Sequence, residues 1–282
     1  MKGEFGMKAV IDMHRHLVLT QDLPIQKMLD DMTQNNVERA VLLALPDHPR
    51  WKLMHIGGTA DVLQACSASN GRSIPAIYVD PREGATRLSK VLGNFYQSGG
   101  RCLKMIPAVG YYPDDPALNE VWALINELGF IVILHTGVIG HRDVIPREVY
   151  LDIRLNSKYC QPIYLDALAR IYPDISFVAA HLGAPWMAEA IRLAQMHRNI
   201  YLDCSGNILE ELAQFDGLVC RRNYRQGIYA KIVFGTEGGQ YRKSIEDYQK
   251  VFGKSSLGQH QEAIFYDNAR GLLERYGLMS AK

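Results

Sequence analysis

The sequence of 282 residues has no excess of charge of either sign, no paired cysteine motif and no long hydrophobic run. Its 31 lysine and arginine residues nearly balance its 30 aspartate and glutamate residues, which excludes the broad basic field typical of nucleic-acid binding. Its five cysteines include no C-x-x-C pair, so we expect reduced thiols rather than a disulfide framework. No apolar run reaches the ~18 residues of a membrane span, and the amino-terminal segment lacks a signal-peptide core. These absences indicate a cytoplasmic protein whose partner is a small molecule, with neither nucleic acid nor membrane involved.

Short β-branched runs alternate with amphipathic segments along the sequence. Eight runs have the composition of buried strands, namely KAVID, RAVLLAL, IPAIYVD, RCLKMIP, FIVILH, ISFVAAH, NIYLD and KIVFGT. Helical patterns such as PIQKMLDDMTQNN and DPALNEVWALINELG lie between them. The alternation predicts an α/β fold of the (β/α)8 TIM-barrel type, with a doubly wound open sheet as the competing arrangement. Because no linker or low-complexity segment interrupts it, we expect a single domain over residues 1–282.

Histidines stand at the ends of three predicted strands. His14 and His16 lie in VIDMHRHL, where strict alternation places them on one face with Asp12, while His135 ends FIVILH and His181 ends ISFVAAH. In a barrel of this type the carboxyl ends of the strands meet at one rim, where active sites form. Neutral imidazoles favour zinc, iron, nickel or copper over calcium or magnesium. The set therefore predicts a site for a divalent transition metal.

Two further ionisable residues lie on predicted strands. Glu237 ends KIVFGTEGG and shares a face with Val233 and Gly235, so it is expected to lie beside the histidines, where a carboxylate can bind metal, accept a proton from water, or do both. The alternative is a surface carboxylate in a turn. Lys104, in RCLKMIP, either points inward and attracts a substrate carboxylate or lies on the outer side beneath a helix. We do not assign it as a metal ligand.

Taken in order, IDMHRH, VILHTG, FVAAHLGAPW, VFGTEGG and IFYDNARGLL resemble the amidohydrolase superfamily over nearly the whole chain. They are most similar to its amidohydrolase-related branch, which includes metal-dependent hydrolases, lactonases and enzymes of the aminocarboxymuconate semialdehyde decarboxylase type. The resemblance implies a divalent metal, zinc with manganese as the alternative, held by His14, His16 and His135, with His181 as a further ligand or as a polariser of substrate and water. The family places an aspartate that binds metal and acts as general base on the eighth strand, and here Glu237 occupies that position as a departure from the pattern.

These observations predict a metal-dependent hydrolase of a small lactone, ester or amide, with Glu237 and His181 as catalytic residues. A decarboxylase acting on an unsaturated carboxylic acid is the first alternative, and a barrel that binds a small ligand without catalysis is the second. The oligomeric state, including a homo-oligomer, is left open.

Substrate contacts are expected from loops that follow the strands. The longest connection runs from Thr136 to Cys160, a length more typical of a lid or binding loop than of a simple connection. Arginines there suit a carboxylate through bidentate pairing. The candidates in these loops are Tyr111, Tyr112, His141, Arg142 and Arg147.

Overall fold

The computed structural model describes residues 9–20, 22–140, 145–219 and 225–280. Eight strands form one parallel sheet in sequence order, each paired with the next. They are β1 (Val10–Arg15), β2 (Val37–Leu43), β3 (Ser73–Tyr78), β4 (Cys102–Met105), β5 (Ile131–Leu134), β6 (Ser176–Ala179), β7 (Ile200–Asp203) and β8 (Ile232–Val233). Hydrogen bonds from Met13 N–H to Phe234 O at 2.8 Å and from Thr236 N–H to His14 O at 3.0 Å join the segment that follows β8 to the first strand. The predicted (β/α)8 barrel is confirmed, and the doubly wound open sheet is excluded.

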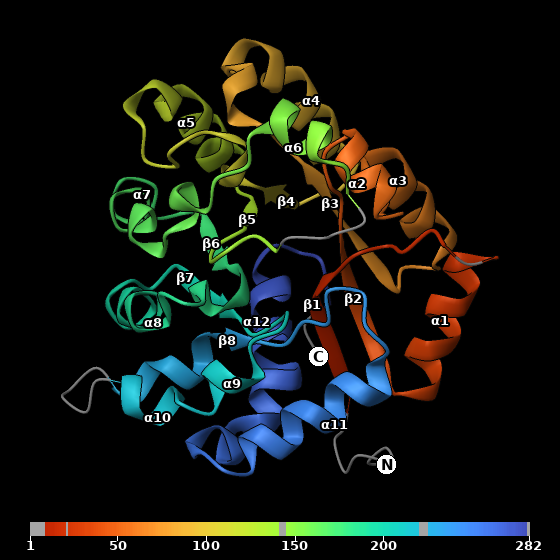
Figure 1. Cartoon of the computed structure of the whole chain (residues 1–282), viewed down its shortest axis with the longest axis vertical. Coiled ribbons are helices and arrows are strands. Elements are labelled where there is room, and N and C mark those ends of the chain that lie inside the picture. Colours follow the sequence, from red (N-terminus) through yellow and green to blue (C-terminus); the bar gives the residue numbers. More distant parts are fainter. Residues whose placement is uncertain (1–8, 21, 141–144, 220–224, 281–282) are drawn as a thin grey trace.

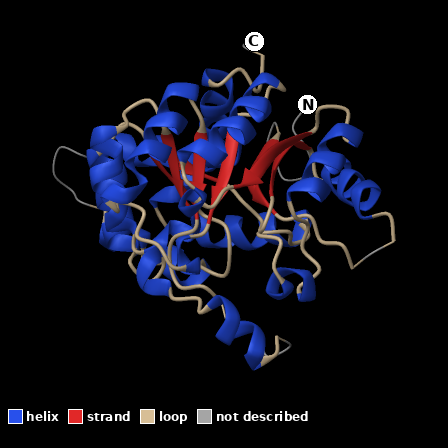
Figure 2. Ribbon diagram, turned by 90° about the horizontal axis from the view of Figure 1, so that it is seen from above, coloured by secondary structure: helices blue, strands red, loops and turns tan. Residues whose placement is uncertain are grey.

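Helices surround the strands, as Figures 1 and 2 show. In the described part of the chain they are α1 (Pro24–Gln34), α2 (Pro49–Leu53), α3 (Thr59–Ala68), α4 (Ala85–Gln97), α5 (Asn119–Leu128), α6 (Arg147–Ile153), α7 (Leu165–Ile171), α8 (Met187–Met196), α9 (Leu209–Leu212), α10 (Phe215–Leu218), α11 (Tyr241–Phe252) and α12 (Asn268–Arg275). Helix α4 is representative, because Leu88, Leu92 and Phe95 recur at helical spacing and are buried. Within the described ranges, no helix combines the length and the apolar character that crossing a membrane would require.

Most of the apolar core lies in two layers, and a smaller third cluster contains Leu45, Trp51 and Ile106. Side chains inside the barrel form one cluster, represented by Ile11, Val41 and Val233, and a larger cluster fills the space between strands and helices. Residues of α12 belong to the inner cluster. Close to that helix, the Tyr266 hydroxyl donates to Glu38 at the start of β2. The carboxyl-terminal segment therefore covers the amino-terminal end of the barrel and leaves the opposite rim for a site.

Strand β1 departs from strict alternation near its end. Its register against β2 shifts between Asp12 and Arg15. Met13 belongs to the inner cluster, whereas the Asp12 carboxylate accepts a hydrogen bond from Thr236 Oγ1 at 2.6 Å, and Arg15 Nη1 donates to the same hydroxyl at 3.2 Å. The prediction that Asp12 shares a face with the two histidines is therefore wrong, because this irregularity brings both Met13 and His14 toward the barrel interior.

The long connection after β5 contains ordered structure of its own. It includes α6 and a 3-10 turn over Ser157–Cys160, and α6 packs beside α2 at the rim (Figure 1). Arg147, at the start of α6, is exposed. The loop candidates His141 and Arg142 lie outside the described residues.

Candidate metal centre

Four imidazoles meet at the carboxyl-terminal rim of the barrel. His14 belongs to β1 and His16 follows it, His135 comes directly after β5, and His181 lies two residues beyond β6. Ring centroids are 5.2 Å apart for His14 and His16, and 5.0 Å apart for both the His14–His181 and His135–His181 pairs. The structure thus brings together residues separated by more than a hundred positions in sequence, while their role as metal ligands stays a prediction.

Three of these imidazoles use their Nδ1 nitrogens in hydrogen bonds that fix the ring orientation. His14 Nδ1 pairs with the Asp203 carboxylate at the end of β7. His16 Nδ1 donates to Leu43 O at 3.0 Å, and His181 Nδ1 donates to Ser205 O at 3.1 Å. Because a carbonyl oxygen only accepts, the contact of His16 places the proton on Nδ1 and leaves the lone pair on Nε2. His181 Nδ1 also lies 3.1 Å from Ser205 Oγ, a hydroxyl that can donate or accept, so this ring has a partner for either tautomer. Metal-binding histidines show the arrangement of His16, in which an outer acceptor selects the tautomer.

The Nε2 nitrogens of His14 and His135 are buried without a hydrogen-bond partner among the described residues. An unpaired buried polar atom is costly, so its presence suggests a group that the protein chain does not supply. Burial lowers the pKa of both imidazoles well below the usual value, and it lowers the pKa of His16 to about 4. All three rings are therefore neutral near pH 7 and keep lone pairs for a Lewis acid.

Glu237 supplies a carboxylate to the same centre. Its Oε1 lies 3.2 Å from His181 Nε2 and 4.0 Å from His14 Nε2, and its side chain keeps 40% exposure. His14, His181 and Glu237 each offer one possible ligand atom, and these three atoms all lie within 4.8 Å of one another. Desolvation raises the pKa of the Glu237 carboxyl, but the surrounding groups, His181 first and the Lys104 ammonium among the others, together lower it. When His181 carries its proton on Nδ1, its Nε2 and the carboxylate oxygen are both acceptors, so a cation or a shared proton must lie between them.

The backbone at two of these positions is strained. Glu237 has φ of 57° and His181 has φ of 58°, both in the left-handed region that disfavours residues with a Cβ. Such conformations persist where the surrounding structure enforces them, often at functional sites. For Glu237 the enforcing contacts include its N–H, which donates to His14 O at 2.8 Å.

Two glycines allow the elements of the centre to approach each other. A Cβ at Gly235 would lie 2.6 Å from His14 Cβ and 2.8 Å from Ser205 Cβ. A Cβ at Gly206, where φ is +88°, would lie 2.8 Å from His181 Nδ1. Only glycine fits these positions without displacement of the histidines.

Lys104 points inward. It is 1% exposed, and together with His16, His135 and Glu237 it lines a cavity of about 160 Å³. Burial lowers the pKa of Lys104 to about 8. The outward-facing alternative is excluded.

Other candidates fall outside this cavity, and Asp203 and Ser205, which contact the histidines, were missed from the sequence. Tyr111 is buried and Tyr112 is 38% exposed, and neither lines the cavity. Asp203 ends the predicted strand NIYLD, so the strand-end rule that selected the histidines also applies to it. Ser205 lies two residues further, and no sequence pattern marked it.

The fold and the site together define a parallel (β/α)8 barrel with a histidine and carboxylate centre at its carboxyl-terminal rim. The profile of the amidohydrolase family matches residues 11–275. The chain therefore belongs to the amidohydrolase family. No curated protein matches the sequence closely enough to be counted as a relative.

Solved structures with the same fold include proteins of two named activities. A probable 2-pyrone-4,6-dicarboxylic acid hydrolase from Acinetobacter baumannii is 16% identical, with a TM-score of 0.60 over 95% of this chain and 99% of that one. A putative 2-pyrone-4,6-dicarboxylic acid hydrolase from Pseudomonas putida is 17% identical, with a TM-score of 0.65 over 97% and 99%. A 2,6-dihydroxybenzoate decarboxylase from Rhizobium is 14% identical, with a TM-score of 0.61 over 95% and 99%. At these identities the likeness concerns the fold.

Proposed function

We propose that this protein is a metal-dependent hydrolase that opens a small lactone, ester or amide. The observation that carries the proposal is the buried, unpartnered Nε2 of His14 and of His135 beside the Glu237 carboxylate. These donors suit zinc, with manganese as the alternative, and His16 and His181 complete the set of candidate ligands. A divalent ion bound there would lower the pKa of a water molecule and polarise a carbonyl group.

Glu237 is the proposed general base. Its lowered pKa keeps it ionised near pH 7, and its partly exposed side chain can reach a water molecule that enters from the rim. The carboxylate takes a proton from that water as the water oxygen bonds to the substrate carbonyl carbon. When the tetrahedral species collapses, the bond to the leaving oxygen or nitrogen breaks and Glu237 returns the proton to it. His181 is the second catalytic residue in the arrangement in which it does not bind the ion, because its Nε2, 3.2 Å from Oε1, can then share this proton and hold the carboxylate in position.

Decarboxylation of an unsaturated carboxylic acid is the second candidate. The inward-facing Lys104 favours it, because a buried ammonium in the cavity wall suits a substrate that carries a carboxylate. The Rhizobium neighbour is a decarboxylase by name, and the two others are described as hydrolases. Product analysis separates these reactions, since release of bicarbonate without ring opening indicates the lyase.

Metal analysis of the purified protein and the Glu237→Gln variant together test the hydrolase. We expect close to one equivalent of a transition metal per chain and loss of ester or lactone hydrolysis in the variant. Glu120→Gln, on the exposed surface of α5, is the matched control and should keep full activity. A protein that takes up no zinc or manganese and has no turnover would instead be a ligand-binding barrel, and unchanged activity of Glu237→Gln would remove this residue from the mechanism.

A further inference from the structure

Arg50 is a buried cation with unused hydrogen-bond donors. It lies in α2, is 2% exposed, and its Nε and Nη1 have no partner among the described residues. Its Nη2 donates to Gly140 O at 2.9 Å, and the guanidinium lies 4.9 Å from the ring centre of Tyr150 in α6. Burying a permanent charge is unfavourable unless a partner supplies acceptors. The guanidinium is thus fixed in position with donors left for a ligand.

Lys104 offers a second cation to the same space. Its Nζ also lacks a partner among the described residues, and it extends from β4 rather than from α2. Both side chains line the cavity of about 160 Å³ that contains His16, His135 and Glu237. A space of this volume holds on the order of five water molecules, so the part of a ligand that enters it is small. Two unpaired cations in so small a cavity favour an anionic ligand.

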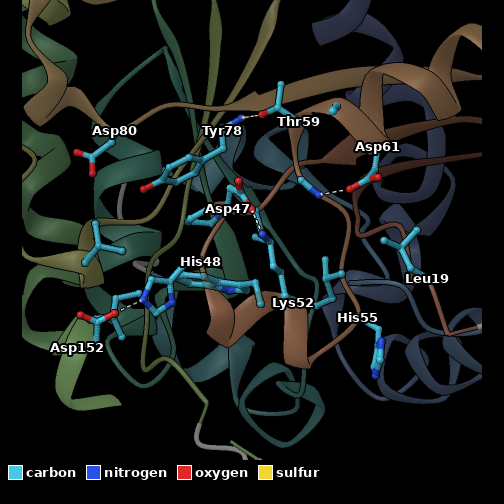
Figure 3. Close-up of a pocket in the computed structure, with 18 of the residues that line it drawn as sticks. Leu19, Asp47, His48, Lys52, His55, Thr59, Asp61, Tyr78, Asp80 and Asp152 are labelled. Atoms are coloured by element: carbon cyan, nitrogen blue, oxygen red, sulfur yellow. Dashed lines mark hydrogen bonds and ion pairs between the residues drawn. The ribbon is translucent and has the colours of Figure 1, made fainter. Parts of the chain in front are cut away.

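The larger neighbouring cavity does not offer such donors. It has a volume of about 1000 Å³ and shares Trp51 with the small cavity. Figure 3 shows Lys52 paired with Asp47 and His48 paired with Asp152 in its wall, and the paired atoms are 2.6 Å and 3.0 Å apart. The unused positive charge is therefore found in the small cavity beside the candidate metal centre.

We propose that Arg50 anchors a carboxylate group of the substrate, with Lys104 as a second cationic contact, so that the substrate is a small organic acid with its reacting carbonyl directed toward Glu237. This inference rests on the proposed function, because it assigns a substrate class to the same cavity. A planar guanidinium suits a carboxylate better than an ammonium does, since it can donate two parallel hydrogen bonds. An uncharged molecule of the same shape as the acid cannot form this charge-assisted pair with Arg50.

Benzoate and its uncharged isostere benzamide are the probes that test this assignment. Their dissociation constants are measured by calorimetry, and by the fluorescence of Trp51 in the cavity wall, on both metal-free and zinc-loaded protein. In the metal-free protein, where no ion can bind the carboxylate, we expect benzoate to bind at least ~10-fold more tightly than benzamide. Arg50→Gln should reduce this preference to the part that Lys104 supports, and Arg50→Lys should keep more of it than Arg50→Gln does. Arg82→Gln is the matched control, because Arg82 lines the larger cavity and already pairs with Asp80.

Two outcomes would overturn the assignment: equal affinity of the unmodified protein for the two probes, or an unchanged preference in folded Arg50→Gln protein. If Arg50→Gln does not fold, Arg50→Lys decides, and an undiminished preference there counts against the bidentate anchor. Failure of the proposed function gives a different result. A protein that binds no metal and hydrolyses nothing, yet prefers benzoate in a manner dependent on Arg50, refutes the hydrolase and retains the anchor. A zinc-loaded, active hydrolase that does not prefer benzoate refutes the Arg50 anchor and retains the hydrolase.

Discussion

Replacing Asp203 by asparagine tests whether the histidine centre binds metal through an oriented tautomer. One carboxylate oxygen of Asp203 accepts from Ser205 N–H at 2.5 Å, and the other accepts from His14 Nδ1. Asparagine has only one acceptor. If that oxygen stays on Ser205, the amide NH₂ faces His14 and forces the proton onto Nε2, which removes the lone pair from the centre. If the oxygen turns to His14, the buried Ser205 N–H faces another donor.

The size of the effect follows from the loss of this outer hydrogen bond. Removing such a partner of a metal-binding histidine weakens metal affinity ~10- to 100-fold, which corresponds to about 1.4 to 2.7 kcal/mol. With zinc at a hundred times the dissociation constant of the unmodified protein, binding stabilises the fold by about 2.7 kcal/mol, and a hundredfold weaker site leaves about 0.4 kcal/mol. The two proteins should therefore differ clearly in thermal unfolding with zinc and much less without it.

Competition between the metal-free protein and a chromophoric chelator gives the zinc affinity directly. Asp166→Asn is the control, because Asp166 also pairs with an imidazole, His197 Nε2 at 2.6 Å, and His197 lies just before the start of β7, whereas Asp203 ends that strand. This control should bind zinc normally. Wild-type zinc affinity in a folded Asp203→Asn protein would refute the tautomer argument and with it the place of His14 in the ligand set.

Three further predictions concern the same centre. Gly235→Ala should lower the free energy of unfolding by ~1–3 kcal/mol in urea titrations, because its Cβ would lie 2.6 Å from His14 Cβ, and an unchanged value would contradict the close approach. As the pH falls from about 6.5 to about 4, the metal-free protein should lose up to about 3 kcal/mol of its free energy of unfolding through His16. In this pH range the unfolded chain takes up a proton on His16, whereas the buried ring, with its pKa of about 4, does not. Equal stability at pH 6.5 and pH 4 would show that the ring is not held neutral. Removal of metal by a chelator should lower the melting temperature, and zinc should restore it, whereas an unmoved transition would argue against any resident ion.

The strand-end histidines could be predicted from the sequence because two rules together locate them. Periodicity locates buried strands, and the carboxyl ends of parallel strands share one rim, so His135 and His181 could be placed near each other without coordinates. The same reasoning fails where a strand is irregular. The register shift in β1 turns the side chains of Asp12 and His14 to different faces of the strand, and a strict period of two does not anticipate it.

Arg50 could not be predicted, because nothing local distinguishes it from a solvated surface arginine. Its burial depends on Tyr150 and Gly140, which come from a different connection about a hundred residues later. Lys104 could be predicted in part. Alternation along its strand limits the side chain to one of two faces, and only the closed barrel selects the inner face. Side chains fixed by regular strands are thus accessible from the sequence, and those fixed by contacts between loops are not.

The left-handed backbone at Glu237 and His181 has a consequence for protein engineering. A residue with a Cβ in this conformation costs roughly 1–2 kcal/mol, which glycine avoids. Glu237→Gly should therefore raise the melting temperature of the metal-free protein while it removes the carboxylate. Libraries selected for thermal tolerance alone would enrich such substitutions and lose activity at the same time, so a stabilisation campaign on this scaffold needs a functional screen at these two positions.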